Sequence, residues 1–344
     1  MTPVPAPRAT IPAGIWVLGG VSLLMDVSSE MIHSLLPMFL VGALGLSVMA
    51  VGLIEGIAEA TAMISKVFSG ALSDRLRRRK SLVVLGYAMA AVTKPVFALA
   101  TGAGMVVAAR FADRVGKGIR GAPRDALLAD LAPGAVRGAA FGLRQSLDTV
   151  GALLGPLLAT GLMLLWANDF RAVFWIATIP AALAVAMLVF GVREPPRAPA
   201  AAVPVNPIRR DALARLGRTY WHVVAIGTVF TLARFSEAFL VLRAQQLGVA
   251  MAWVPLVMVA MNAVYAASAY PFGKLSDKMA RRRLLAPGLA MLIAADLVLA
   301  WASDWTGLLA GVALPSTRSA PISTASPAAS RPWWLTRSAS RPKG

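Results

Sequence analysis

The sequence contains a short cationic stretch, Gly70–Lys80, between two apolar runs of helix length, and this arrangement recurs later in the chain. The flanking residues, 48–69 and 82–100, are mostly apolar. A basic loop between two membrane-length runs is typical of the cytoplasmic side of a membrane protein. The aspartate of the second copy, Asp277, lies 203 residues after that of the first, which indicates two related halves of a transporter rather than a short solenoid repeat. The corresponding positions are Gly70, Asp74, Arg75 and Arg79 in the first copy and Gly273, Asp277 and Lys278 in the second.

The composition is that of an integral membrane protein. Of the 344 residues, 58% are hydrophobic and 15% are charged, and the mean hydropathy is +0.68, whereas soluble domains average about 25% charged residues. The formal net charge of +18 does not favour nucleic-acid binding, because the cations cluster in short segments between apolar runs. The absence of cysteine excludes disulfides and thiolate metal sites, and two histidines are too few for a histidine-rich metal site. We therefore expect neither a metal nor a cofactor.

The apolar runs predict a six-helix half over residues 13–192 and a shorter second half over residues 219–314. A cytoplasmic tail, 1–12, precedes the first half, and a linker rich in proline and arginine, 193–218, separates the two halves. The expected helices are 14–40, 48–69, 81–100, one from about 105 to 120 or beyond, 139–166, 171–192, 220–242, 252–272 and 284–301, followed by the start of a tenth at 304–314.

The distribution of lysine and arginine predicts one orientation in the membrane. The expected internal loops carry most of the cations, and the expected external loops carry few charges. By the positive-inside rule, the amino terminus and the central linker then lie in the cytoplasm. We expect a multi-pass protein of the bacterial inner membrane, in contact with the lipid bilayer and monomeric.

The Gly-x-Leu-x-Asp-Arg sequence followed by a basic cluster, with its second copy, resembles the signature loop of the major facilitator superfamily. The resemblance covers about residues 13–314 and implies an all-α, polytopic bundle, here with about 9–10 helices. It further implies secondary active transport of a small molecule by alternating access, with sites between the halves near the bilayer midplane. It also implies that Asp74 and Asp277 are gating residues that engage helix ends of the opposite half, where an N-terminal dipole favours a carboxylate.

From residue 315 onward the chain is rich in serine, proline, alanine and arginine, and no apolar run of spanning length remains. A complete member of the superfamily has six helices in each half, so we expect a truncated or frame-shifted second half and a disordered tail over 315–344. A natural tail that replaces three helices is the alternative. If the second half is incomplete, a transport-incompetent membrane protein, surviving as an interaction protein or gene remnant, is the alternative to a transporter. A membrane enzyme is disfavoured, because no catalytic or cofactor constellation stands out.

The first apolar run is interrupted by Asp26, Glu30 and His33, whose spacing puts all three on one helical face. Charge inside a membrane segment is costly and points to a function. Two nearby carboxylates can share a proton, which suits proton coupling. The alternative is a structural set that is neutralised by a cation of the fourth or fifth helix. Ser236-Glu237 in the second half echoes Ser29-Glu30, and we include Glu237 and its neighbour Arg234 among the candidates.

The second and fourth helices carry further intramembrane charge. Glu55 and Glu59 are four residues apart and are candidates for the cavity lining or an external gate, or for pairing with a neighbouring helix. The fourth helix presents a polar face that cannot meet lipid. Its stretch Arg114-Val-Gly-Lys-Gly resembles the superfamily's fourth-helix motif, which implies that Arg114 is the buried arginine linked to proton transfer; Arg110 is the other candidate. A phosphate cradle at residues 116–121 is disfavoured, because no strand precedes it. The residues of this face are Arg110, Asp113, Arg114 and Lys117.

The fifth helix combines a charge pair with small residues. Arg144 and Asp148 are four residues apart and are expected to pair with each other. Gly151, Gly155 and Pro156 resemble the Gly-x-x-x-Gly-Pro motif of the superfamily's antiporters, although the residues that follow depart from it. Close helix packing alone also explains the glycines. The resemblance slightly favours export, so the expected function is proton-coupled transport of a small molecule, with protons and the solute as its partners.

Overall fold

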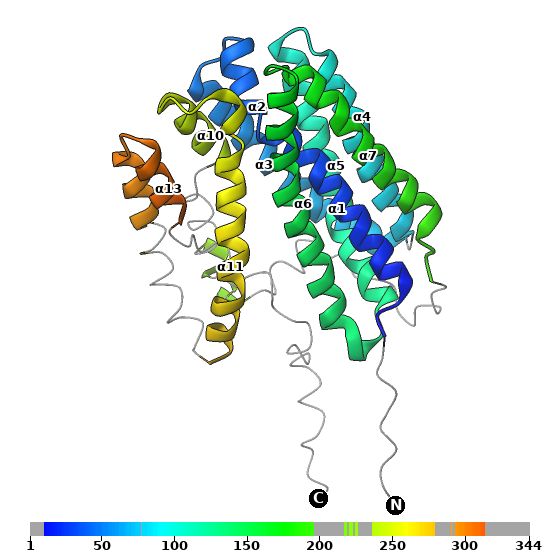
Figure 1. The fold of residues 1–344 in the computed structure, drawn as a ribbon. Coiled ribbons are helices and arrows are strands. Elements are labelled where there is room, and N and C mark those ends of the chain that lie inside the picture. The colour runs from blue at the N-terminus through cyan, green and yellow to red at the C-terminus, as the bar shows by residue number, and fades with distance from the viewer. Residues whose placement is uncertain are drawn as a thin grey trace, which may run out of the picture. The chain divides into compact units, whose positions relative to one another are not determined.

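The computed structural model describes residues 10–76, 78–195, 217–218, 220–222, 224–225, 236–278, 290 and 293–313, with the side chains of residues 269–278 left out. Throughout this part of the chain, the regular elements are helices (Figure 1). The chain forms two compact units, an N-terminal unit, Met1–Asn262, and a C-terminal unit, Ala263–Gly344.

Residues 13–192 form six long helices, as the apolar runs of this part of the sequence predict. They are α1 (Ala13–His33), α3 (Val48–Leu76), α4 (Arg79–Leu99), α5 (Ala103–Leu131), α6 (Arg137–Leu165) and α7 (Phe170–Gly191). Shorter elements join or follow them: α2 (Leu36–Met38), the π-helical η1 (Phe39–Ala43), the 3-10 turns η2 (Gly134–Val136) and η3 (Met251–Trp253), and α10 (Glu237–Gln246).

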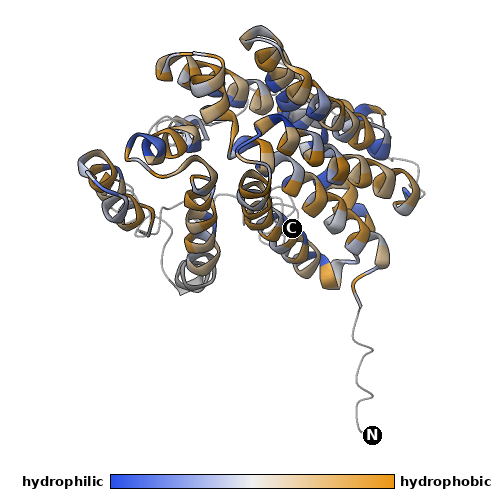
Figure 2. Ribbon diagram, turned by 45° about the horizontal axis from the view of Figure 1, so that its top comes forward, coloured by the Kyte–Doolittle hydropathy of each residue, from blue (hydrophilic) through white to orange (hydrophobic). Residues whose placement is uncertain are grey.

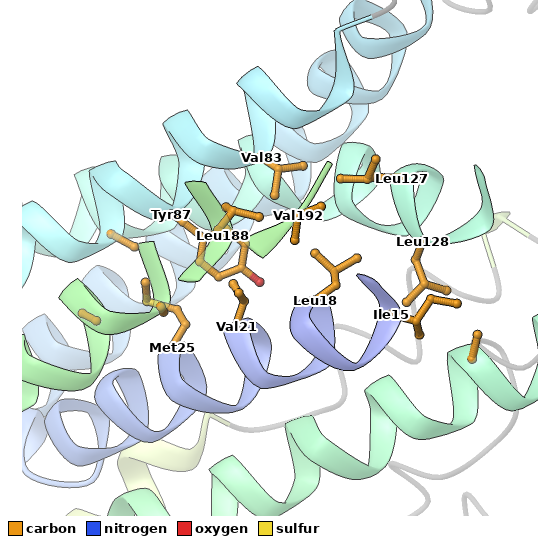
Figure 3. Packing of buried hydrophobic residues seen from close by; sticks show 14 of the residues in the cluster. Ile15, Leu18, Val21, Met25, Val83, Tyr87, Leu127, Leu128, Leu188 and Val192 are labelled. Atoms are coloured by element: carbon orange, nitrogen blue, oxygen red, sulfur yellow. The ribbon is translucent and has the colours of Figure 1, made fainter. Parts of the chain in front are cut away.

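Among the long helices, α1 packs against α6 and α7, and α5 packs against α3 and α4. The apolar core lies where α1, α4, α5 and α7 meet, and Figure 3 shows α1 residues facing Tyr87 of α4 and Leu188 of α7. The α1 residues Leu18, Val21 and Met25 recur every three or four positions, so one stripe of the helix is buried. This packing fixes the rotation of α1 and therefore the direction of its polar face.

Six described segments are long and apolar enough to cross a membrane: Ala13–Ala43, Val48–Leu76, Arg79–Leu99, Gly134–Leu165, Phe170–Gly191 and Met251–Ser268. Large apolar side chains are exposed on their outer faces, such as Leu53 on α3 and Phe190 on α7. Figure 2 shows hydrophobic positions along these helices, as expected when hydrocarbon is the solvent. Helix α5 differs because it carries the polar face predicted from the sequence.

The C-terminal unit begins inside α11 (Leu256–Lys278), which starts four residues later than the predicted helix 252–272 and continues beyond its end. Residues 293–301 are helical, and the remainder of the predicted helix 284–301 is largely outside the described residues. The expected start of a tenth helix is α13 (Trp305–Ala313). It packs on the preceding helical residues, since a Cβ atom added at Gly311 would lie 2.6 Å from the side chain of Leu299.

Two sequence-based boundaries in the first half are wrong. The predicted helix 14–40 is divided: α1 ends at His33, and the short elements α2 and η1 follow it. The division occurs because Pro37 lacks the N–H that a continuous helix needs. The cationic stretch is mostly helix: residues 70–76 complete α3, and Arg79 begins α4. Gly70 lies at a close contact between α3 and α5, since a Cβ atom added there would lie 3.3 Å from the Cβ atom of Ala122.

The predicted helix 220–242 is interrupted before Glu237. Ser236 has an extended backbone (φ −74°, ψ 140°), and its hydroxyl accepts a hydrogen bond from the N–H of Ala238, so that α10 starts afresh at Glu237. Serine at this position is a strong helix N-cap. Residues 226–235 lie outside the described part of the chain.

Candidate functional site

The polar face of α1 contacts α5 through His33. Its imidazole lies within reach of two guanidinium groups, those of Arg110 and Arg114. Glu30 lies one turn earlier on α1, with its Oε1 atom 3.6 Å from Nδ1 of His33. The sequence could not choose between the two arginines, and the structure brings both to the same ring.

Two acid–arginine pairs join α3 to α5. Glu55 pairs with Arg110, and Glu59 Oε1 lies 2.8 Å from Nη1 of Arg114. In both pairs the arginine follows the acid by 55 residues, because the two helices run parallel in constant register. The pairs differ in burial: the Glu55 side chain is 8% exposed, and that of Glu59 is 48% exposed.

A third ion pair joins α4 to α5, and sequence reasoning did not include its lysine among the candidates. Lys94 is completely buried, and its ammonium group donates to Asp113 at 3.0 Å and to the hydroxyl of Ser29 on α1 at 3.1 Å. The signal was available, because a lysine in the middle of an apolar run needs a partner. Lys94 thus ties three helices together at the level of the arginines.

The donors around His33 favour one tautomer, since the shorter contact of Arg114 Nη2 is with Nε2, at 2.6 Å, and its longer contact is with Nδ1, at 3.2 Å. A guanidinium group has only N–H donors, so the Nε2 atom that receives Arg110 and Arg114 must offer its lone pair. In this tautomer the ring proton is on Nδ1, which lies 3.6 Å from Oε1 of Glu30. We name this set the His33 cluster: Glu30, His33, Glu55, Glu59, Lys94, Arg110, Asp113, Arg114 and, acting electrostatically on Glu30, Lys117.

A second polar group lies further along α5. Arg124 donates to the hydroxyl of Ser22 on α1 at 3.2 Å, and the Arg120 guanidinium stacks 4.6 Å above the ring of Tyr87 on α4. On α6, Arg144 donates to Asp148 at 2.5 Å, as their spacing predicts. Asp26 of α1 interacts electrostatically with Asp148, Arg120 and Arg124 of this second group, and also with Glu30 and Lys117, so it lies between this group and the His33 cluster.

Small residues allow the helices to approach closely enough for these contacts. A Cβ atom at Gly155 would lie 2.8 Å from the carbonyl oxygen of Val27, and one at Gly151 would lie 2.8 Å from that of Leu23. The predicted packing glycines therefore place α6 against α1, with Pro156 buried in the same helix. Gly86 and Gly116 have the same role between α4 and α5.

At the other end of α3, the predicted gating residues form an ion-pair group. Arg79 donates to Asp130 at 2.6 Å and lies 3.5 Å from Asp74, and its backbone N–H donates to Glu194 at 2.8 Å. Arg75 lies on the exposed last turn of α3. This group links the ends of α3, α4, α5 and α7.

The remaining candidates are in the less fully described part of the chain. Glu237 opens α10 and acts electrostatically on Glu30. Arg234 lies outside the described residues, and Gly273, Asp277 and Lys278 belong to α11, with side chains that are not described. Within the described residues, no three histidine or acidic side chains are arranged to hold a metal ion.

Known proteins with similar sequences are transporters or uncharacterized proteins. The family model of the Major Facilitator Superfamily matches residues 18–333. The chain is 34% identical over 281 residues to an uncharacterized MFS-type transporter of Methanocaldococcus jannaschii. This match covers 80% of this chain and 69% of that protein. It is 35% identical over 183 residues to an uncharacterized protein of Mycobacterium tuberculosis, covering 53% of this chain but only 44% of that protein.

Solved structures with a similar fold are also transporters. A bacterial homologue of the human lysosomal transporter Spinster, inward-facing and unoccupied, has a TM-score of 0.66 at 20% identity, covering 91% of this chain and 75% of the other. A POT family transporter in complex with 5-aminolevulinic acid has a TM-score of 0.64 at 15% identity, covering 89% and 81%. At these identities the likeness concerns the fold alone. The match of the family model over most of the sequence establishes that this chain belongs to the Major Facilitator Superfamily.

Proposed function

We propose that this protein carries out secondary active transport of a small molecule by alternating access, and that the transport is coupled to protons through the His33 cluster. Family membership supports transport of a small molecule. The coupling is proposed from the chain's own residues. The second group around Arg124 and the ion pairs at Arg79 are proposed to hold helix ends together during the cycle.

The observation that carries the proposal is the charge pairing within the His33 cluster. Arg110, Arg114 and Lys94 each have a carboxylate partner, namely Glu55, Glu59 and Asp113. Within the described residues, Glu30 has no arginine or lysine within the 4 Å of an ion pair. Lys117 and Arg114 act on it electrostatically, and its close partner is the titratable ring of His33. A carboxylate without a fixed counter-charge inside a membrane bundle can gain and lose a proton without breaking a permanent ion pair.

The orientation, location and direction of transport are also proposals. The loop charges support a cytoplasmic amino terminus and a multi-pass protein of the bacterial inner membrane. The glycine and proline positions at the α1–α6 contact support export, by the antiporter resemblance, and we propose that the protein works as a monomer.

The test is solute-dependent proton movement in liposomes that contain the purified full chain and an internal pH dye. A panel of small solutes is applied, and the unaltered protein is expected to move protons with at least one of them. Glu30→Gln keeps the shape of the side chain but removes its proton, so it is expected to abolish this movement.

The matched control is Asp169→Asn, another acid-to-amide change. Asp169 caps α7 by accepting from the N–H groups of Arg171 and Ala172, and asparagine caps helices equally well. This control should retain the proton movement. Equal movement in Glu30→Gln and in the unaltered protein, or solute entry without any proton movement, would contradict the proposal.

A further inference from the structure

Two guanidinium groups from successive turns of α5 converge on a single nitrogen atom. Nη1 of Arg110 and Nη2 of Arg114 both lie against Nε2 of His33, the second at 2.6 Å. The imidazole nitrogen has one lone pair and no charge in this tautomer. It therefore accepts from one donor at most, although two positively charged donors point at it. Nη2 of Arg114 also lies 3.2 Å from Nδ1, and the nearest acid to Nε2 is Asp113, with Oδ2 at 3.9 Å.

Each arginine contacts His33 with one terminal nitrogen and forms its ion pair with the other. Arg110 uses Nη2 to hold Glu55, and Arg114 uses Nη1 to hold Glu59. The remaining terminal nitrogen of each arginine lies against His33. The Nε atoms of both arginines are buried without a hydrogen-bond acceptor. Both arginines thus have more donor capacity at this point than the protein groups around them fill.

An oxyanion matches this arrangement better than the imidazole does. A carboxylate or phosphoryl group offers at least two oxygen atoms, each with two lone pairs, and carries negative charge. Charge-assisted hydrogen bonds to such groups are about twice as strong as neutral ones. The two α5 arginines, spaced by one helical turn, can each donate to a different oxygen of the same group.

The charged groups around the site differ in their exposure. The charged groups facing His33 are Arg110, Arg114, Lys94, Lys117, Asp113 and Glu30. Lys94 and Asp113 are buried together at the inner side, whereas Glu59 and Lys117 are exposed in the N-terminal unit. The exposed side of the cluster is therefore that of Glu59 and Lys117, where Lys117 adds a further cation.

We propose that Arg110 and Arg114 form an oxyanion seat which His33 fills in this structure, and that the transported solute carries a carboxylate or phosphoryl group which displaces the imidazole. The inference rests on the proposed transport function, because it names the chemical class of the solute. When no solute is bound, the imidazole takes the place of the solute's oxyanion and provides a hydrogen-bond acceptor for the two guanidinium groups.

The experiment uses the two-histidine composition of the chain. In a His222→Gln background, ¹⁵N-labelled histidine reports on His33 alone in the purified full chain in detergent. Without ligand, the spectrum should show a neutral ring with its proton on Nδ1. Acetate, methyl phosphate and the neutral acetamide are then titrated separately. We expect a saturable shift of the Nε2 resonance with at least one anion, and the two anion arms distinguish carboxylate from phosphoryl recognition.

The variants separate the seat from general effects. Arg114→Lys keeps the charge but loses the planar fork, so it should weaken the anion-induced shift by about tenfold or more. Arg171→Lys is the matched control, since Arg171 donates to the carbonyl of Ala100 away from the cluster, and should leave the shift unchanged. Equal shifts with acetamide, or none with either anion, would overturn the oxyanion seat.

The same data distinguish this inference from the transport proposal. An anion-dependent His33 shift without solute-dependent proton movement in liposomes would support the seat and count against proton coupling. Proton movement with neutral solutes only, combined with no anion shift, would support coupled transport and overturn the seat.

Discussion

At the scale of single residues, Lys94 is a sharp test of the buried charge network. It is completely buried and pairs with Asp113, so Lys94→Met leaves a carboxylate in the interior without its closest cation. Removing one partner of a buried ion pair typically costs about 3–5 kcal/mol. We expect a loss of this order in the free energy of unfolding, measured by denaturation of the purified protein in detergent.

The double variant Lys94→Met, Asp113→Asn serves as the internal check. With both charges gone, much of the lost stability should return, because a neutral buried pair has little desolvation to offset. Lys66→Met on the exposed side of α3 is the control for loss of a lysine and should change stability little. A double variant as unstable as the single one would show that the pair does not act as described.

Glu55 and Glu59 offer a second residue-scale prediction, since each pairs with an α5 arginine but their burial differs sixfold, at 8% and 48% exposed. Glu55→Gln leaves Arg110 buried with weaker compensation, and we expect a loss of about 2–4 kcal/mol. Glu59→Gln should cost less than about 1 kcal/mol, as for other solvent-screened pairs. Chemical unfolding of both variants measures the difference, and equal losses would contradict the burial argument.

At the scale of helices, the contact between α1 and α6 depends on two glycines. Gly155→Ala would place a methyl group 2.6 Å from Cβ of Glu30 and 2.8 Å from the carbonyl oxygen of Val27. Backbone cannot yield as a flexible side chain can, so we expect a loss of about 1–3 kcal/mol. The thermal midpoint of the purified protein, followed by tryptophan fluorescence, measures this.

Gly161 on the same helix provides the matched control, because nothing lies within 4 Å of the position that its Cβ would occupy. Gly161→Ala should be neutral or stabilising by about 0.5–1 kcal/mol, since alanine has the higher helix propensity. A Gly155→Ala protein as stable as Gly161→Ala would mean that the two helices do not pack at these residues.

The helices themselves were largely predictable, and their interruptions were not. Runs of about 20 apolar residues locate the spans of the first half, because length and hydropathy are local properties. The breaks at Ser34–Leu35 and Ser236 depend on single residues inside an apolar pattern, Pro37 in one case and a serine cap in the other. Both residues can be read from the sequence, but a prediction based on the apolar pattern alone assigns one continuous helix across them.

At the scale of the whole molecule, the proposed orientation predicts which surface each loop exposes. The chain has no cysteine, so a single introduced cysteine gives an unambiguous signal. Thr101 and Ala135 are exposed at opposite ends of α5, whose 29 residues span about 43 Å. In intact cells, an impermeant thiol reagent should label Thr101→Cys and should label Ala135→Cys only after the membrane is opened. The reverse pattern would contradict a cytoplasmic amino terminus.

The site was predictable in composition but not in its pairings. Spacing placed Glu30 and His33 on one face and gathered Arg110 and Arg114 on another. Which acid meets which arginine depends on the register of α3 against α5, and close contacts between distant segments set this register. Such contacts are tertiary, so a single sequence does not disclose them.

Glu30, beside His33, is proposed to couple solute movement to protons. The most direct test compares two modes of transport in liposomes, using a solute identified by its proton movement. One mode is exchange of labelled for unlabelled solute, and the other is accumulation of labelled solute driven by a pH gradient. We predict that Glu30→Gln retains exchange and loses accumulation, since binding remains while the proton site is gone. Accumulation by Glu30→Gln equal to that of the unaltered protein would contradict the claim.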